Sequence, residues 1–406
     1  MTKKQQAVIY LGGSYPQLSG IKAAKDLGLF VVVVDRDPIA PARKFANLFK
    51  EISLIDVPEL LDLADIISER FQLICVYGIA DYAFRSVAAI TERFDLPMAS
   101  REAFERAMNK SFSKRMWDFR GLPVSRGVTI STFEDTDDAV CHILDELEFP
   151  VIVKPADSCS SRGVKSFREK NFAKIWDAIF SAREYSDDVV VEELLDGRHF
   201  NVDGLFANGI FYPVTVTERF FLDNDIHQGL YGLQPPEIDE SWNTRMFSIT
   251  KEAACAIGLR QGPVTADIIW TGSGPVLLEL SPHFHSIATM SLRTNGVCNP
   301  LKAWFSYLMG MEGWKDFLKD DGKFYGGYYF VYHREYGEVR RVRGLQEALK
   351  ILYITDIDLS RTEGSMIGCP DGKSDLSGIV WAVGEKRQQV KESLRKASEK
   401  ISFELK

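Results

Sequence analysis

Residues 264–280 have the sequence VTADIIWTGSGPVLLEL and carry the clearest structural pattern in the chain. Two apolar segments, 264–270 and 275–280, flank a short polar turn with two glycines at 271–274. Apolar segments separated by such a turn are typical of a β-hairpin. The pattern therefore predicts two antiparallel strands that lie side by side.

Each strand of this predicted hairpin carries one carboxylate, Asp267 and Glu279. Side chains at paired positions of two antiparallel strands face each other, and two neighbouring carboxylates repel unless a cation lies between them. Mg²⁺ binds hard oxygen ligands and needs few protein ligands when it also binds phosphates. The pair therefore favours a magnesium site, and the alternative is a hairpin face on which both acids are solvated.

A second set of signals, upstream of the hairpin, indicates an anion-binding site. The strand FPVIVKP at 149–155 places Lys154 next to a loop of small residues at 156–164. Backbone N–H groups of such a loop can approach anion oxygens, and a lysine adds a point charge. A helix begins at NKSFSK, residues 109–114, and a further strand covers 188–193. Each of these signals alone is equally typical of an ordinary loop or a solvated lysine.

The first hundred residues alternate between strands and helices. Apolar segments at 7–13, 29–35 and 73–78 are separated by helical segments near 19–28 and 58–70. Unbroken β-branched segments are typical of parallel strands covered on both faces. The alternation predicts a doubly wound α/β unit.

The turn after the first strand raises a dinucleotide-binding alternative. Gly-Gly-Ser at 12–14 stands where a dinucleotide fingerprint would begin, and Asp-Arg-Asp at 35–37 stands where a ribose-binding acid would lie. The G-x-G-x-x-G spacing is absent. A tight strand–helix turn is therefore favoured, and a nicotinamide-dependent oxidoreductase is kept as a weaker alternative.

Composition narrows the class of protein. The 406 residues carry a formal net charge of −8, which argues against a nucleic-acid partner. There is no apolar stretch of the ~18 residues that a membrane span needs, and the first residues do not resemble a signal peptide. Six scattered cysteines without a C-x-x-C pair fit a reducing compartment. These features predict a cytoplasmic protein with no membrane partner.

The order of the signals resembles the ATP-grasp superfamily, in the branch that contains L-amino-acid ligases, biotin carboxylase and the purine-biosynthetic ATP-grasp enzymes. The resemblance covers residues 7 to about 395. It implies an α/β (α+β) fold with a doubly wound parallel pre-ATP-grasp domain at 1–100. It further implies an ATP-grasp domain at 101–320, with a lid subdomain at about 122–194, and a small β-rich C-terminal domain at 321–406 that closes the active site.

The resemblance also implies the nucleotide-binding residues. Lys110 and Lys154 match the two nucleotide lysines, and 158–163 matches the loop that covers the phosphates. VEELL at 191–195 matches a hinge in which one acid and backbone groups contact adenine, and His199 matches a ribose-contacting position. The implied ATP-binding set is Lys110, Lys154, Ser160, Ser161, Gly163, Glu192, Glu193, Leu195 and His199.

At the hairpin the resemblance implies Asp267, Glu279 and Ser281 as ligands of Mg²⁺, with Mn²⁺ as an alternative metal. The family usually has Glu-x-Asn-x-Arg where this chain has ELSPH at 279–283, so Ser281 replaces an asparagine and His283 replaces an arginine. That arginine commonly binds a carboxylate or an acyl phosphate. Either His283, with its charged form favoured by the bound anion, or Arg293 is expected to take this catalytic role.

A glycine-broken, aromatic segment at 217–236 is predicted to cross the mouth of the acceptor site, with His227 and Tyr231 as substrate-binding residues. An ordinary connecting loop is the alternative. The last eighty residues are predicted to form strands near 325–332 and 379–383 and a final helix at 385–401.

The resemblance implies an ATP-dependent carboxylate–amine ligase. In this reaction a small-molecule acid, which is amino-acid-like in the family, attacks ATP to form an acyl phosphate and ADP. An amine then displaces phosphate to give an amide or peptide bond. An ATP-dependent carboxylase that uses bicarbonate is the alternative, and a non-catalytic nucleotide-binding protein is weaker. A second copy of the chain, in a homodimer, is a further possible partner.

Overall fold

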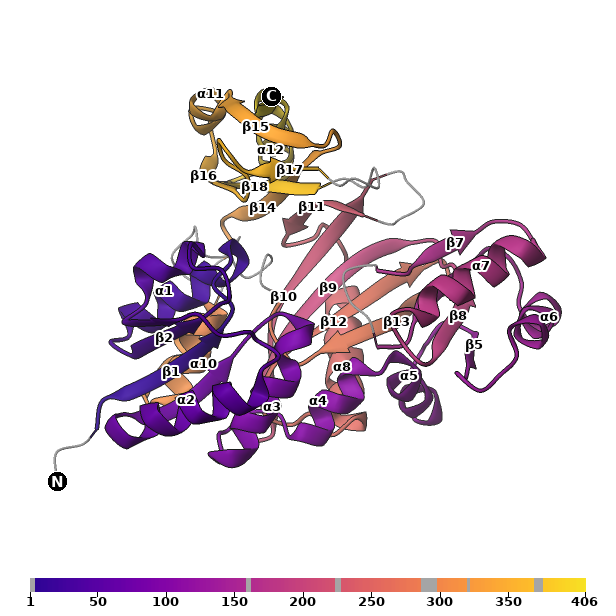
Figure 1. Cartoon of the computed structure of the whole chain (residues 1–406), viewed down its shortest axis with the longest axis horizontal. Helices are drawn as coiled ribbons and strands as arrows, with labels where there is room; N and C mark the ends of the chain where they lie inside the picture. The colour runs from indigo at the N-terminus through magenta and orange to yellow at the C-terminus, as the bar shows by residue number, and fades with distance from the viewer. Residues whose placement is uncertain (1–3, 158–161, 223–227, 286–297, 320–321, 369–374) are drawn as a thin grey trace.

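The computed structural model of this chain describes residues 4–157, 162–222, 228–285, 298–319, 322–368 and 375–406. Within these residues the strands form four sheets: a parallel N-terminal sheet, a lid sheet, an eight-stranded central sheet, and a three-stranded sheet in the C-terminal unit (Figure 1). The longest sheet lies between the other units and carries the predicted hairpin.

The N-terminal sheet is parallel, with the order β3-β2-β1-β4. Buried β-branched side chains fill β2, as the sequence predicts. Right-handed crossovers place α1 on one face of the sheet and α2 on the other. The elements are β1 (Gln6–Leu11), α1 (Leu18–Asp26), β2 (Phe30–Val34), β3 (Leu48–Lys50), α2 (Val57–Arg70), β4 (Gln72–Tyr77) and α3 (Phe84–Arg93).

The turn after β1 is a tight strand–helix connection. Gly12 has φ +112°, and a Cβ atom there would overlap the Gln17 side chain. The N–H of Gly13 donates to Asp35 Oδ2 at 2.7 Å, and the N–H of Asp37 donates to Asp35 Oδ1 at 3.0 Å. Both oxygens of the acid that a ribose would need therefore bind the chain's own backbone, which counts against the dinucleotide alternative.

The lid unit is an antiparallel sheet with two helices on it. Its strands have the order β5-β8-β6-β7, and the helices α6 and α7 bury Ile143 and Ile179 against Val151 and Val191. The elements are β5 (Gly127–Ile130), α6 (Thr136–Glu146), β6 (Val151–Pro155), β7 (Lys165–Phe167), α7 (Phe172–Arg183) and β8 (Val189–Glu193).

The central sheet has eight strands in the order β13-β12-β9-β10-β11-β14-β18-β16. Helix α8 (Glu240–Ala256) packs against β9, β12 and β13, and α4 (Arg101–Met108) and α5 (Lys110–Phe119) lie at the β13 edge. The first five strands along this order are β13 (Gly274–Ser281), β12 (Gly262–Thr271), β9 (Arg198–Ala207), β10 (Ile210–Phe221) and β11 (Gly229–Gln234).

The C-terminal unit continues this sheet. Strands β14 (Tyr325–His333), β18 (Asp375–Gly384) and β16 (Ile354–Leu359) extend it beyond β11, and α12 (Arg387–Lys400) packs on β14 and β18. The sheet thus passes through the predicted boundary near residue 320, and the domain boundaries stay a prediction. The remaining elements are α10 (Pro300–Leu308), which packs on α1, then β15 (Gly337–Arg343), α11 (Leu345–Leu349), β17 (Met366–Ile367) and β19 (Ser402–Leu405).

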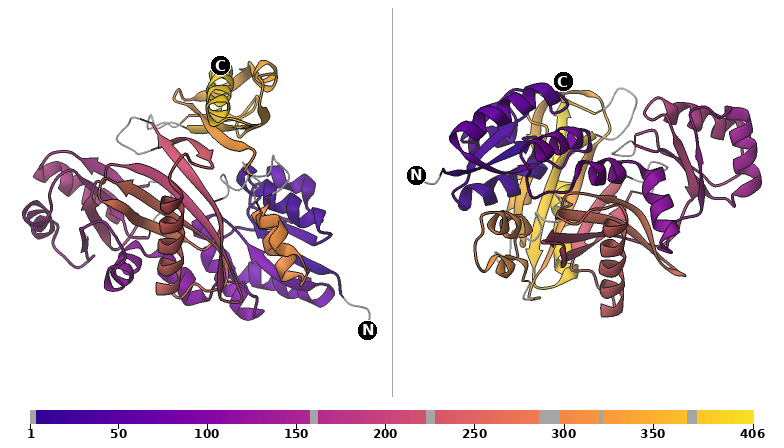
Figure 2. Two further views of the ribbon diagram at one scale, coloured as in Figure 1. Left: turned by 180° about the vertical axis from the view of Figure 1, so that it is seen from behind. Right: turned by 90° about the horizontal axis from the view of Figure 1, so that it is seen from below.

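Two views from other directions show the N-terminal unit and the lid on opposite sides of the central sheet (Figure 2). The mixed α/β class, the parallel N-terminal sheet and the β-rich C-terminal part are confirmed. None of the described helices combines the length and apolar character needed to cross a bilayer.

Candidate active site

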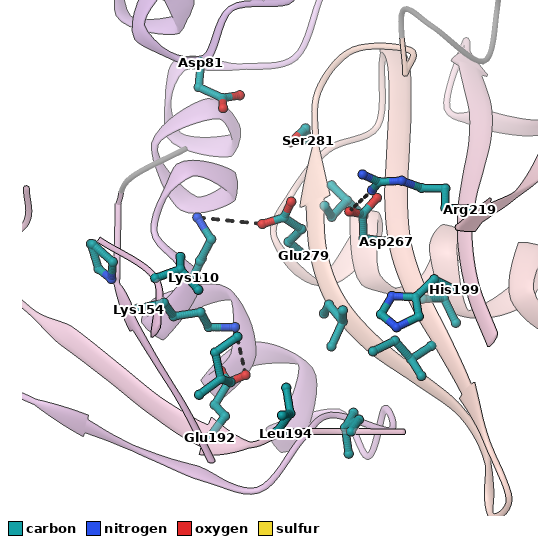
Figure 3. A pocket seen from close by; sticks show the side chains of 18 of the residues that line it. Asp81, Lys110, Lys154, Glu192, Leu194, His199, Arg219, Asp267, Glu279 and Ser281 are labelled. Carbon is teal, nitrogen blue, oxygen red and sulfur yellow. Dashed lines mark hydrogen bonds and ion pairs between the residues drawn. The ribbon is translucent and has the colours of Figure 1, made fainter. Parts of the chain in front are cut away.

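A cavity of about 340 Å³ opens between the lid, helix α5 and the central sheet (Figure 3). Lys110 reaches it from α5, Lys154 and Glu192 from the lid strands, and Asp267 and Glu279 from the hairpin β12–β13. Two predicted lysines and two predicted acids, which are distant in sequence, therefore line one cavity.

Lys110 is placed by the start of α5. Asn109 caps the helix by accepting a hydrogen bond from the N–H of Phe112 at 2.8 Å, and the N–H of Lys110 donates to the carbonyl of Ala156 in the lid at 2.9 Å. The ammonium group then lies 3.7 Å from Glu279 Oε2. Lys110 thus connects the lid side of the cavity to the hairpin.

Glu192 is buried among positive charges. Lys154 Nζ lies 2.8 Å from Glu192 Oε2, Ser125 Oγ donates to the same oxygen at 2.9 Å, and Lys114 contacts Oε1. Burial alone would raise the pKa of Glu192, but Lys154 and Lys114 lower it to about 2. Glu192 therefore stays ionised and holds Lys154 at the cavity wall.

Lys114 belongs to this site, although its role was not predicted from the sequence. Its side chain is 10% exposed and contacts Glu192 and Ser125. Burial, and then the charge of Lys154, lower the pKa of Lys114 to about 7. The sequence signal for Lys114 was its spacing from Lys110. Residues i and i+4 lie on the same face of a helix, so both lysines are expected to point to the same side of α5.

The hinge residues form the wall at the lid end of the cavity. Glu193, Leu194 and Leu195 line it, as does His199 on β9. The His199 ring lies 4.7 Å from that of Phe221, a second lining residue. The wall is thus partly apolar and aromatic, and the nucleotide contacts of Glu193, Leu195 and His199 stay predictions.

The two hairpin acids are paired as the sequence predicts. Asp267 on β12 is the direct partner of Glu279 on β13. Burial raises the pKa of Asp267 to about 7 and outweighs the opposing charge of Arg219. For Glu279 burial acts in the same direction, but Lys110, Lys154 and Arg219 together hold its pKa below the ordinary value.

This donor set fits a magnesium ion that also binds a ligand. The oxygens of Asp267 and Glu279 are hard ligands, and Ser281 lines the cavity beside them. Among the described residues there is no group of three or more histidine, cysteine or acidic side chains that could hold a metal alone. An ion here would complete its shell with water or phosphate oxygens, as Mg²⁺ commonly does.

Arg219 on β10 also lines the cavity, although no role was predicted for it from the sequence. Its Nη1 lies 3.0 Å from Asp267 Oδ2, and its guanidinium carbon lies 5.0 Å from the centre of the Phe221 ring. The segment TERFF at 217–221 offered a signal for Arg219. Alternate side chains of a strand share one face, so Thr217, Arg219 and Phe221 are expected to point to the same side.

His283 does not line the cavity, and its charge in the presence of an anion stays a prediction. Its Nδ1 lies 2.7 Å from the carbonyl oxygen of Phe284, so Nδ1 carries a proton and donates it there. The ring lies 5.5 Å from that of Phe84. Burial lowers the pKa of His283 despite the nearby Asp81. The neutral form is therefore favoured in this structure, not the charged form.

Tyr231 also lies outside the cavity lining. Its ring stacks on Phe220 at 4.3 Å and faces Tyr329 at 5.7 Å. Phe220 is the neighbour of Arg219 and its strand partner is Tyr231, so both point to the face opposite the cavity. The expected substrate contact of Tyr231 is therefore not supported.

Some predicted residues lie outside the described residues: Ser160, Ser161, His227 and Arg293. Gly163, the last residue of the predicted phosphate loop, is described and has φ +72°. A Cβ atom there would come within 2.9 Å of Pro155 and Tyr185, so the close approach of these side chains requires glycine.

Two family models match this chain. The ATP-grasp domain model matches residues 147–290, which include most of the lid, the hinge and the hairpin. The model of L-amino acid ligase C-terminal domain 2 matches residues 329–406. The first match covers most of the residues that line the cavity, and the second covers the C-terminal unit, whose strands extend the central sheet.

Individual relatives agree with these matches. D-alanine–D-alanine ligase from Methylibium petroleiphilum is 31% identical over 209 residues, which are 47% of this chain and 63% of that protein. The chain covers only 38% to 63% of the length of the first curated relatives that it matches.

Solved structures show the same fold. L-amino acid ligase from Bacillus licheniformis has a TM-score of 0.82 at 16% identity, with 100% of both chains covered. The biotin carboxylase domain of Hydrogenobacter thermophilus 2-oxoglutarate carboxylase, a dimer with MgADP and bicarbonate, has a TM-score of 0.76 at 15% identity and covers 100% of this chain and 92% of that one.

The fold, the hairpin register and both family matches agree with the resemblance found in the sequence. Residues 147–290 of the chain match an ATP-grasp domain, and residues 329–406 match L-amino acid ligase C-terminal domain 2.

Proposed function

We propose that this protein is an ATP-dependent carboxylate–amine ligase that forms an amide or peptide bond through an acyl phosphate. The observation that carries the proposal is the cavity in which Lys110 and Lys154 face the paired acids Asp267 and Glu279. The match to an L-amino acid ligase domain and the similarity to D-alanine–D-alanine ligase support amino-acid-like substrates.

ATP would lie with its adenine at the hinge and its phosphates between Lys110, Lys154 and the hairpin. Mg²⁺, or Mn²⁺, held by Asp267 and Glu279 with Ser281 nearby, would neutralise phosphate charge. Lys154 keeps its position through Glu192, and Lys110 keeps its position through Glu279. These residues act by placement and charge, which provide most of the catalysis of phosphoryl transfer.

A carboxylate oxygen of the acid would attack the γ-phosphorus. The bond to the β-phosphate oxygen breaks, and its electron pair leaves with ADP. The amine nitrogen then attacks the acyl carbon, phosphate leaves with the oxygen that it gained, and the nitrogen loses a proton. Because the enzyme holds the reactants at contact distance, each step no longer depends on a collision between free molecules, and its barrier is lower.

The experiment is a screen for ADP release. Pairs of L-amino acids, D-alanine pairs and bicarbonate are each incubated with ATP and Mg²⁺. Ligase function predicts ADP release that requires both an acid and an amine. Release with bicarbonate would favour the carboxylase alternative, and release with neither would contradict both enzymes.

Glu279→Gln provides the internal control of this screen. The amide keeps the size of the side chain but removes the charge that faces Asp267, so we expect turnover to be abolished at ordinary magnesium. Glu105→Gln, at an exposed helix position, should not change turnover. Activity of Glu279→Gln within a few-fold of the wild type would mean that the hairpin acids do not hold the metal ion of the reaction.

Two further parts of the proposal concern the whole protein. A cytoplasmic location agrees with the composition. A homodimer is supported by the dimer named for the biotin carboxylase domain, and light scattering of the purified chain tests it.

A further inference from the structure

The proposed reaction brings a negatively charged acid to a place that already holds negative charge. Asp81, Asp267 and Glu279 all line the cavity. Glu192 engages Lys154, and Glu279 lies near Lys110. A carboxylate beside the γ-phosphate would need a further cation, because like charges at this distance repel strongly at low dielectric.

Arg219 provides a positive charge next to the acid pair, on the central-sheet side of the cavity. Among the described lining residues it is the one lysine or arginine that comes from the central sheet. Figure 3 shows it across the Asp267–Glu279 pair from Lys110, and Glu192 and Leu194 lie at the other end of the cavity. Arg219 therefore borders the acceptor side of the acid pair, away from the hinge.

The surroundings of Arg219 hold its side chain in place. Asp267 binds Nη1 at 3.0 Å, and the Phe221 ring lies beside the guanidinium carbon at 5.0 Å. The phenol of Tyr328, which is 2% exposed, interacts with Arg219 from β14. A guanidinium has five N–H donors in a rigid plane, so it can bind a carboxylate or phosphate through two parallel bonds while it retains another partner.

We propose that Arg219 binds the oxyanion of the acid substrate, and of the acyl phosphate formed from it, beside the acid pair. This inference rests on the proposed function. It gives Arg219 the role that the resemblance assigns to an arginine at the position of His283, which is neutral and outside the cavity here.

Product phosphate provides a probe that does not require the substrates to be known. In the proposed reaction the released phosphate carries the oxygen that came from the acid, so it passes through the same oxyanion position. The affinity of inorganic phosphate for the full chain saturated with MgADP is measured by titration calorimetry. The MgADP affinity itself is measured first for each variant.

We expect Arg219→Met to weaken phosphate binding by at least about tenfold, because a charge-assisted pair of hydrogen bonds is lost, and to leave MgADP affinity within a few-fold. Arg219→Lys should lie between the wild type and Arg219→Met, and it serves as the folded variant if Arg219→Met does not fold. Arg198→Met is the matched control, because Arg198 makes a similar ion pair with Glu218, at 2.7 Å, on the opposite face of the sheet.

Unchanged phosphate affinity in Arg219→Met, or in Arg219→Lys where only that variant folds, would overturn the proposal. An equal loss of phosphate affinity in Arg219→Met and Arg198→Met would also overturn the proposal. Loss of MgADP binding in Arg219→Met alone would overturn it as well. So would a wild-type chain that binds MgADP but no phosphate. Failure of the ligase proposal is seen separately, as a screen in which no acid and amine pair releases ADP.

Discussion

Asp203 on β9 is a fully buried carboxyl group next to the candidate active site. Its Oδ1 accepts a hydrogen bond from the N–H of His285 at 2.7 Å, and Thr265 is its partner on β12. Burial raises the pKa of Asp203 to about 8, against the effect of these two hydrogen-bonding groups. The folded protein therefore keeps this carboxyl protonated at neutral pH.

Asp203→Asn should reduce the loss of stability at alkaline pH. The pKa of Asp203 is about 8 in the fold and 3.8 in the unfolded chain, so its contribution to stability is complete below about pH 4 and declines as the pH rises towards 8. The uncharged amide does not titrate. Melting temperatures at pH 5 and pH 9 should differ less in Asp203→Asn than in the wild type; an equal difference would contradict the assignment.

Lys114→Met should make the protein more sensitive to acid. The pKa of Glu192 is about 2 in the fold and 4.5 as the ordinary value, so its stabilising contribution is present above about pH 4.5 and is lost as the pH falls towards 2. Removing one of its two lysines raises that folded pKa. The midpoint of acid unfolding, followed by circular dichroism, should move to higher pH.

Lys174→Met, at an exposed position of α7, is the control for this measurement. The two lysine variants lose the same charge, so a shift shared by both would reflect net charge alone. A midpoint that stays at the wild-type value in Lys114→Met would show that Lys114 does not stabilise ionised Glu192.

The sequence predicted single residues well where local geometry determines them. The hairpin pattern predicted that Asp267 and Glu279 lie on two adjacent strands, but their direct pairing depends on a register shift between Asp267 and Ile268 that the turn alone does not determine. Arg219 was missed because its partner Asp267 lies on a strand that is not adjacent to β10. The surroundings of His283 could not be predicted, because the Phe84 ring that packs on it is distant in sequence.

At the scale of the element, β11 shows how one glycine positions a side chain of the site. Gly232 pairs with Arg219 on β10 and with Tyr328 on β14. A Cβ atom at Gly232 would lie 2.4 Å from the Tyr328 ring. The missing side chain leaves the space in which Tyr328 lies across β11 and reaches Arg219.

Gly232→Ala should therefore destabilise the protein by about 1–3 kcal/mol, which is typical when a well-packed interior must accept an extra methyl group. Urea unfolding gives the free energy. Gly229→Ala on the same strand is the control, since its Cβ atom would meet the nearest atom, on Phe330, at 3.5 Å. Equal effects of both substitutions would show that the Tyr328 contact is not what requires glycine.

The same strand determines on which face Tyr231 lies. Its neighbour Gly232 lies on the cavity face, and a shift of one residue along a strand turns a side chain to the other face. The sequence predicts an aromatic segment here, but the face that each residue occupies depends on how β11 pairs with β10 and β14.

At the scale of the whole molecule, a buried ion network joins the C-terminal unit to the central sheet. Glu218 on β10 is 5% exposed and binds Arg198 on β9 at 2.7 Å. It also contacts Arg387, the first residue of α12. Arg387 further lies 3.8 Å from Glu237. The network lies on the face opposite the cavity, one residue from Arg219.

Glu218→Gln should lower the free energy of unfolding by about 3–5 kcal/mol, because removing one member of a buried ion network leaves charges without a partner. Chemical unfolding measures it. Asp65→Asn removes the partner of Arg93 in a bidentate but exposed ion pair and should leave stability near the wild-type value. Comparable losses in both variants would contradict a special role for the buried network.

The overall architecture was predictable from two features of the sequence. Alternating strands and helices predict the parallel N-terminal sheet, and the order of the later motifs resembles that of ATP-grasp enzymes. The continuity of the central sheet was not predictable, since the pairing of β11 with β14 joins segments about ninety residues apart and leaves no local sequence signal. The sequence therefore indicates the units, and the long-range strand pairing that joins them has to come from the structure.

Transfer of an oxygen atom from the acid to phosphate distinguishes an acyl-phosphate ligase from an enzyme that only hydrolyses ATP. The acid found by the ADP-release screen is labelled with ¹⁸O in its carboxylate and incubated with ATP, Mg²⁺ and the amine, and the released phosphate is analysed by mass spectrometry. An acyl-phosphate ligase places one ¹⁸O atom in each phosphate, because the attacking carboxylate oxygen leaves with the phosphoryl group. Phosphate without the label would contradict an acyl-phosphate intermediate.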